Sequence, residues 1–297
     1  MAEKPDIGKV GVWQGMLDRQ ATPQVKDAVA EIEAMGWPTL WRPEALGRDP
    51  FVSAAIMLEA STKLKVATGI AQITARHPMT AVAGQKTLAE AYDNRFVLGI
   101  GVSHAPFVEG MHGLSYAKPY SQMVDYLEKM RSASYMSVEP TQTPPTILAA
   151  LGPKMLKLAA TQADGAHPYF VPPEHTAQAR EIMGPDALLA PEQKVVLETD
   201  PTKAREMARS GMTFYMDLPN YMNNLRRLGF SEEDVTQCSD RLVDGVVAWG
   251  SLDDVLARIK AHHDAGADHV AIQVITGEGF GGDLPMKEWR ELAEALL

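Results

Sequence analysis

The sequence is poor in cysteine and has no long apolar run, and each absence removes a class of protein. Cys238 is the single cysteine in 297 residues, so the chain forms no internal disulfide, which is typical of a reducing cytoplasm. Residues 1–8 are charged and lack the apolar core of a signal peptide. No stretch reaches the ~18 apolar residues that a membrane helix needs. We therefore predict a cytoplasmic protein with no membrane partner.

Excess positive charge and several catalytic motifs are also absent. The net charge of −10 disfavours nucleic acid as a partner, although local backbone amides still suffice to bind a phosphate. A P-loop and a G-x-S-x-G nucleophile elbow are missing, which removes support for an NTPase or a serine hydrolase. Glu44, His104 and His167 lack metal-ligand spacing, so we predict no metal site. His262 and His263 are adjacent on a predicted helix, and we expect both on its solvated surface.

What the sequence has is a regular alternation of short apolar strands and amphipathic helices. The predicted strands cover residues 10–13, 39–41, 66–70, 96–100, 146–149, 165–169, 194–197 and 269–274. Helices are predicted in the intervals between them, as parallel strands require. Eight such units predict an α/β fold, a (β/α)8 TIM barrel, formed as a single domain of residues 1–297.

Two long stretches, 101–145 and 198–250, predict insertions after strands four and seven of this barrel. A doubly wound sheet is the alternative fold. That fold usually has G-x-G-x-x-G after its first strand, and residues 11–15 do not carry it.

The stretch from Arg95 to Phe107 ends a predicted buried strand in a polar loop. In a TIM barrel the loops after the strands gather on one face and hold the active site. Gly101, Ser103 and His104 follow the fourth strand directly. Because an imidazole titrates near neutral pH, His104 is a candidate for proton transfer. An ordinary loop after a core strand is the alternative interpretation.

Residues 151–154, with the sequence Leu-Gly-Pro-Lys, predict an anion site at a helix start. Gly152 permits close approach of the backbone, and Pro153 removes a donor that has no partner at a helix start. The remaining N–H groups share the positive helix end with Lys154, which suits a phosphate. A helix start without a ligand is the alternative. The segment 69–71, after the third strand, gives a flat rim for a planar ring.

Four segments in order resemble the luciferase-like flavin and deazaflavin oxidoreductase superfamily, and the match covers nearly the whole chain. They are Leu40-Trp41-Arg42-Pro43-Glu44; Ala67-Thr68-Gly69-Ile70 with Arg76-His77-Pro78; Arg95-Phe96-Val97-Leu98-Gly99-Ile100-Gly101; and Trp249-Gly250-Ser251 with Ala265-Gly266-Ala267-Asp268-His269-Val270. The compact length and the segment Ala149-Ala150-Leu151-Gly152-Pro153 resemble the branch that uses the deazaflavin coenzyme F420 rather than FMN.

The resemblance implies a barrel with the cofactor's ring across the strand ends. It also implies a cis peptide bond at or beside Gly69–Ile70, and the cofactor's phosphate at the helix start after Gly152. The residues to which we assign cofactor binding are Trp13, Glu44, Gly69, Ile70, Gly101, Ser103, Leu151, Gly152, Pro153 and Lys154. The residues to which we assign substrate contact are Trp41, Phe107 and His167.

The sequence departs from the family pattern at the residues for proton transfer. Family members that oxidise sugar phosphates have an Asp-His pair after strand two and a Glu after strand four. Here Glu44 stands at the Asp position, Ala45 replaces the His, and His104 stands at the Glu position. Sugar-phosphate oxidation is therefore not expected, and His104 and Glu44 are the catalytic candidates.

The combined prediction is an oxidoreductase that transfers a hydride between F420 and an unidentified small organic substrate, with a homodimer as the expected assembly. An FMN-dependent luciferase-like monooxygenase is one alternative. A non-catalytic flavin-binding barrel, which the alanine at position 45 permits, is the other.

Overall fold

The computed structural model describes residues 4–278 and 282–297, in which strands and helices alternate along the chain. Residues 1–3, part of the segment in which we expect no signal peptide, lie outside the described residues. The strands are β1 (Val10–Trp13), β2 (Thr39–Arg42), β3 (Lys65–Thr68), β4 (Ala71–Gln72), β5 (Phe96–Gly101), β6 (Thr146–Leu148), β7 (Gly165–Ala166), β8 (Leu188–Leu189), β9 (Glu192–Val196), β10 (Val247–Trp249) and β11 (Val270–Val274).

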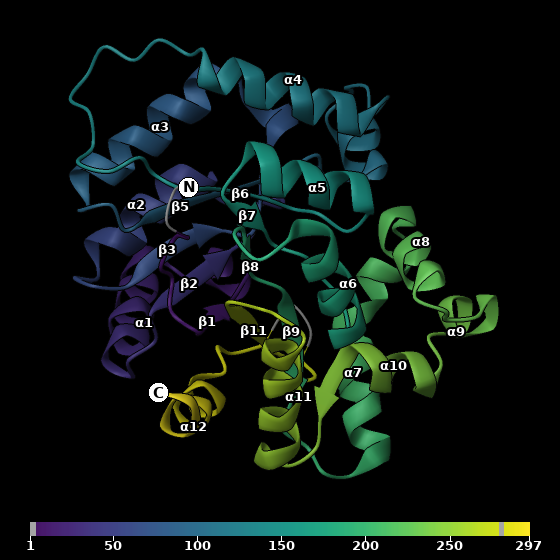
Figure 1. The fold of residues 1–297 in the computed structure, drawn as a ribbon. Coiled ribbons are helices and arrows are strands. Elements are labelled where there is room, and N and C mark those ends of the chain that lie inside the picture. The colour runs from purple at the N-terminus through teal and green to yellow at the C-terminus, as the bar shows by residue number, and fades with distance from the viewer. Residues whose placement is uncertain (1–3, 279–281) are drawn as a thin grey trace.

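The helices fill the intervals between the strands. They are α1 (Thr22–Ala34), α2 (Pro50–Glu59), α3 (Pro78–Ala91), α4 (Pro119–Arg131), α5 (Pro153–Gln162), α6 (Pro173–Met183), α7 (Pro201–Met216), α8 (Pro219–Arg227), α9 (Glu232–Gln237), α10 (Asp240–Val246), α11 (Leu252–Asp264) and α12 (Met286–Leu296). A short π-helix, η3 (Pro106–Met111), follows β5. Figure 1 shows the helices around the central strands, with α8 and α9 at one side, away from α1 and α2.

Every strand pair in the described residues is parallel, and the sheet follows chain order over most of its width. The order is β10-β9-β11-β1-β2-β3-β5-β6-β7-β8, with β4 beside β5. Only Ala190 and Pro191 separate β8 from β9. The segment 188–196 therefore pairs with β7 at its start and with β11 at its end. This double pairing curls the sheet into a TIM-barrel-like form.

Alternation along the strands separates two apolar layers. Leu40 and Leu98 belong to the layer shared with the surrounding helices, whereas their neighbours Trp41 and Val97 belong to a second cluster. Because successive side chains of a strand point to opposite faces, this second cluster lies on the inner face of the curled sheet. Residues from α7 and α8, including Met212 and Leu225, join it.

Each of the eight predicted strands is present, the first with its predicted bounds 10–13 and the others with shifted ends, and some elements were missed. The predicted strand 165–169 stops at Ala166, because Pro168 has no N–H for a ladder and Phe170 has a φ of 62°. β4, β8 and β10 contain two or three residues each, too few to show alternation. The long connection after β9, predicted as an insertion, holds the helices α7 to α10, and the connection after β5 holds η3 and α4.

His262 corrects the prediction that both histidines of α11 face solvent. Its side chain is completely buried. Its Nδ1 lies 2.8 Å from Thr176 Oγ1 and its Nε2 lies 2.8 Å from Gln193 Oε1. Gln193 Nε2 in turn donates to the carbonyl oxygens of Lys194 and Val246. His262 therefore joins α11 to α6 and β9, while His263 is half-buried.

Across the described ranges, no helix combines the length and apolar character needed to cross a membrane.

The buried histidines predict a stability that falls as the pH is lowered. Burial lowers the pKa of His262 and of His269 to about 3 each. Between the ordinary pKa near 6.5 and these values, the unfolded chain binds protons that the folded chain does not. Stability is therefore fully present above pH 6.5 and falls by ~1.4 kcal/mol per pH unit for each group within that window.

Chemical unfolding at pH 7, 6 and 5 measures this slope. His262→Gln, which retains one donor and one acceptor for the two neighbours, is expected to flatten it, whereas the exposed His112→Gln keeps the wild-type slope. Equal slopes in wild type and His262→Gln would contradict the assignment.

Candidate active site

Gly69 lies at the end of β3, where three aromatic side chains meet. The Gly69–Ile70 peptide bond is cis, at the place that the family resemblance implied. A Cβ at Gly69 would lie 2.9 Å from Trp13 Nε1 and 3.3 Å from both His167 Nε2 and Trp41 Cε3. Since these neighbours are rigid rings, only glycine fits without a shift of the surrounding side chains. Three predicted site residues from β1, β2 and the end of β7 thus form one floor beneath Gly69.

Stacking and hydrogen bonds fix the rings of this floor. Trp41 is fully buried, stacks on His167 with ring centroids 4.3 Å apart, and donates from Nε1 to His269 Nε2 at 3.0 Å. His269 Nδ1 bonds the Gly8 carbonyl at 2.8 Å. Trp41 therefore supports the floor through His167 and His269, and its contact with a substrate stays a prediction.

Two buried polar atoms of the floor have no hydrogen-bond partner within the described part of the chain. They are Trp13 Nε1 and His167 Nε2, and both lie against Gly69. His167 Nδ1 lies 2.7 Å from the Ala190 carbonyl and therefore carries the proton. Burial lowers the pKa of His167 to about 4, so the ring is neutral at pH 7. The floor thus offers one N–H donor, Trp13 Nε1, and one unprotonated imidazole nitrogen, His167 Nε2, which is an acceptor.

The side chain of Ile70 and that of Ala149 occupy the space next to Gly101. A Cβ at Gly101 would lie 2.6 Å from Ile70 Cδ1 and 3.0 Å from the Ala149 Cβ. Packing against Ile70 is therefore sufficient to explain the small residue. Ser103, two positions later, has a φ of 61°, and its carbonyl accepts from Tyr116 Oη.

An ion pair with an aromatic enclosure lies next to this floor, because the Tyr169 ring of the enclosure packs against Trp13. Lys194 Nζ and Glu192 Oε1 are 3.0 Å apart, and both side chains are completely buried. The ammonium lies 3.9 Å from the ring centre of Tyr169 and 4.7 Å from that of Tyr215. Glu192 Oε2 accepts from the Phe170 N–H. Both charges are thus compensated, by each other and by ring faces and a backbone donor.

This enclosure connects the barrel to α7 and α8. Tyr169 Oη hydrogen bonds with Tyr215 Oη and Gln273 Oε1, each at 2.7 Å. The Tyr169 ring packs against Trp13 at 5.1 Å and against Tyr221 at 5.9 Å. The aromatic residues of 214–222 therefore cover the inner layer.

His104 lies at the rim of the same enclosure. Its ring is 5.0 Å from Tyr221 and 6.4 Å from Phe107, and both neighbours are partly or fully buried. Asn220 Nδ2 lies 3.3 Å from His104 Nδ1. Burial lowers the pKa of His104 to about 4, so this imidazole is also neutral at pH 7.

The predicted anion site lies at the start of α5. Gly152 is its N-cap, no side chain caps the helix, and Pro153 and Lys154 are exposed. His175 Nε2 holds the Leu151 carbonyl at 2.9 Å. Arg227, at the end of α8, places Nη2 3.8 Å from a Cβ built on Gly152. Within the described residues its guanidinium contacts Asn224 Oδ1 and forms no ion pair, which leaves donors for an anion.

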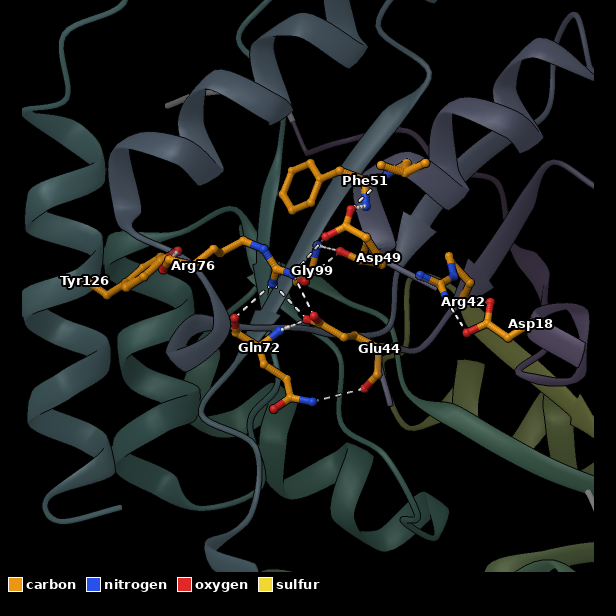
Figure 2. A network of polar contacts seen from close by, with 11 residues as sticks. Asp18, Arg42, Glu44, Asp49, Phe51, Gln72, Arg76, Gly99 and Tyr126 are labelled. Atoms are coloured by element: carbon orange, nitrogen blue, oxygen red, sulfur yellow. Dashed lines mark hydrogen bonds and ion pairs between the residues drawn. The ribbon is translucent and has the colours of Figure 1, made fainter. Parts of the chain in front are cut away.

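Glu44 lies in a different network, drawn in Figure 2. Arg76 donates to both of its carboxylate oxygens, at 2.6 and 2.8 Å, and the Gln72 N–H donates to Oε2. The Glu44 and Arg76 side chains are only 12% and 10% exposed. Glu44 thus holds the loop after β2 to the segment after β4, and both of its oxygens are occupied.

The structure brings Trp13, Trp41, Gly69 and His167 together, and it places His104 and Phe107 against the cover. Sequence reasoning missed Glu192, Lys194, Asn220 and Arg227 as candidates. Opposite charges two positions apart, at 192 and 194 inside an apolar stretch, were a usable signal for the first two. No local pattern marks the other two. No group of three or more metal-ligating side chains occurs in the described ranges.

A sequence model of luciferase-like monooxygenases matches residues 11–269. The chain belongs to this family. A protein from Mycobacterium tuberculosis named as a coenzyme F420-dependent oxidoreductase, Rv3520c, is 24% identical, and the alignment covers 90% of this chain and 94% of that one.

Two solved structures of F420-dependent enzymes resemble this member of the luciferase-like family. An F420-dependent secondary alcohol dehydrogenase in complex with an F420-acetone adduct aligns over 100% of both chains, with a TM-score of 0.77 and 14% identity. The coenzyme F420-dependent tetrahydromethanopterin reductase from Methanopyrus kandleri aligns over 98% of this chain and 97% of that one, with a TM-score of 0.76 and 18% identity. These likenesses establish the fold.

The network in Figure 2 predicts a structural effect for Glu44→Gln. The substitution leaves the mostly buried Arg76 without its bidentate carboxylate, so we expect a loss of about 1–3 kcal/mol in the free energy of unfolding. Asp49→Asn is the control, because Asp49 is 51% exposed and lies 3.6 Å from Arg76; we expect a smaller loss. Urea unfolding measures both. Unchanged stability together with lost turnover would instead assign Glu44 a direct catalytic role.

Proposed function

We propose that this protein is an oxidoreductase that transfers a hydride between the deazaflavin coenzyme F420 and a small organic substrate. Family membership supports the reaction class, and the full-length relatives named for F420 support the cofactor. Within the chain, the observation that carries the proposal is the cationic helix start at Gly152–Lys154 beside Arg227.

The residues present fit such a cofactor at two points. The uncapped start of α5 has free N–H groups, the exposed Lys154 and an Arg227 without an acidic partner in the described residues, which together suit a phosphate. At the end of β3, Trp13 Nε1 and His167 Nε2 are buried polar atoms without a partner in the described residues, and a donor beside an acceptor suits the polar edge of a ligand.

F420, when bound, supplies a ring carbon that accepts or donates a hydride, and the protein orients it. Leu151, Gly152, Pro153 and Lys154 hold the phosphate end in this proposal, while Gly69, Ile70, Gly101 and Ser103 border the ring. Phe107 and the aromatic cover exclude water from the reacting atoms. His104 contacts the substrate, and Glu44 orders the loop beside it.

The same proposal includes the finer architecture and setting. We propose a complete (β/α)8 barrel in one domain, with insertions after the fourth and seventh barrel strands, acting in the cytoplasm as a homodimer. The strand pairings of the segment 188–196 support the closed barrel.

Equilibrium titration tests the cofactor. F420 is expected to bind, with FMN far weaker, when each titration is followed by the change in ring fluorescence or absorbance. Lys154→Ala and Arg227→Ala should each weaken the binding of F420 by about 1–2 kcal/mol, roughly a 5- to 30-fold increase in Kd, because each removes a charged donor to the phosphate. Lys157→Ala, an exposed lysine further along α5, should leave Kd unchanged.

Each alternative function has a distinct outcome in this experiment. Tight FMN binding with oxygen consumed during substrate turnover would overturn F420 in favour of a monooxygenase. Tight F420 binding without hydride transfer to any of a broad set of alcohols and carbonyl compounds would favour a non-catalytic binding protein. If Lys157→Ala and Lys154→Ala changed the Kd of F420 equally, the start of α5 would not be part of the cofactor site.

A further inference from the structure

A chain of hydrogen bonds connects His104 to a backbone carbonyl. Tyr116 Oη lies 3.0 Å from the Ser103 carbonyl oxygen. Asn220 Nδ2 lies 2.9 Å from Tyr116 Oη and 3.3 Å from His104 Nδ1. The chain joins three segments, namely the loop after β5, the loop before α4 and the first turn of α8.

The carbonyl end determines the direction of every bond in this chain. A carbonyl oxygen only accepts, so Tyr116 donates its single proton to Ser103. The Tyr116 oxygen then accepts from Asn220, which requires that the NH2 group of the amide, not its oxygen, faces Tyr116. The same NH2 group faces His104 Nδ1. That nitrogen must therefore be an acceptor, and the imidazole proton must lie on Nε2.

We propose that Asn220 holds His104 as the neutral Nε2–H tautomer, so that His104 donates a hydrogen bond to a carbonyl oxygen of the substrate rather than acting as a proton acceptor. This inference rests on the proposed oxidoreductase function and names the group that its substrate presents at this position. Asn220 is a positioning residue here, because it acts through His104.

The surroundings of His104 keep the ring neutral and leave Nε2 available. Tyr116 and Tyr221 are the titratable groups in contact with His104 and Asn220. Burial alone lowers the pKa of His104, and no charged side chain contributes to that shift. Nε2 has no hydrogen-bond partner in the described residues and is not among the buried unpartnered atoms. It is therefore open to a ligand at the rim of the cover.

A neutral N–H donor suits reduction of a carbonyl better than deprotonation of an alcohol. When a hydride reaches a carbonyl carbon, the π electron pair moves to the oxygen, which then takes a proton from water to give the alcohol. A hydrogen bond from Nε2–H stabilises the negative charge while it develops. A base that removes an alcohol proton needs a free lone pair at Nε2, which this tautomer lacks.

The tautomer is tested by NMR on the cofactor-free protein. Long-range proton–nitrogen correlations of 15N-histidine-labelled protein at pH 7 distinguish the two neutral forms, with His104→Gln used to assign the signal. The expected pattern is Nε2–H. An Nδ1–H pattern in the wild type overturns the proposal, and because no cofactor is present, this outcome is independent of whether F420 binds.

Asn220→Asp is the decisive variant, because a carboxylate accepts and cannot donate. Nδ1 must then carry the proton, so the pattern should change to Nδ1–H and the pKa of His104 should rise by about 1–3 pH units. Asn223→Asp makes the same chemical change on the exposed side of α8 and should leave His104 unchanged. An Nε2–H pattern that survives in folded Asn220→Asp overturns the proposal.

Tyr116→Phe provides a second variant in case the first does not fold. Without the hydroxyl, the Asn220 amide can turn its oxygen toward His104, so an Nδ1–H population should appear. With a carbonyl substrate and reduced F420 as the hydride donor, Asn220→Asp should lower kcat more than tenfold at pH 7 and leave the Kd of F420 unchanged. A wild-type kcat overturns the role in catalysis, whereas a changed Kd of F420 together with the expected change of tautomer would contradict only the assigned cofactor site.

Discussion

The lack of a side chain at Gly69 is the constraint on which the interior depends. Trp13, Trp41 and His167 reach this point from three strands, and the nearest ring atom lies 2.9 Å from where a Cβ would be. Trp41 is held in turn between His167 and His269, whose Nδ1 bonds the backbone near the start of the chain. Because protein interiors are close-packed, a displacement at Gly69 is transmitted through these rings to the Tyr169 cover.

The interior contains several ionisable groups, yet almost no uncompensated charge. Burial keeps His104 and His167 neutral, and Lys194 is paired with Glu192. Removing one member of such a pair costs about 3–5 kcal/mol, because the other charge is left buried alone. An interior of low polarity strengthens each remaining hydrogen bond and dipole. The positive charge that remains available lies outside the enclosure, at Lys154 and Arg227.

Local patterns predicted what local physics determines. Alternating strands and the Gly-Pro helix start at residues 152–153 follow from short segments, and both were found there. The cis peptide bond at Gly69–Ile70 was implied by the family resemblance, and it was found as well. The partners of the site residues were not predictable, because they come from distant segments: Asn220 is 116 positions from His104, and Arg76 is 32 positions from Glu44. His262 was misplaced because helical spacing alone does not reveal that α6 covers that face of α11.

The segment between β9 and β10 has a consequence for how this protein changes over evolutionary time. It is one uninterrupted run of four helices, and it contributes Tyr215, Tyr221, Asn220 and Arg227, while the floor beneath Gly69 comes from elsewhere. Substitutions that reshape the cover are therefore expected to fall within about a sixth of the sequence, apart from the strands and the floor beneath Gly69.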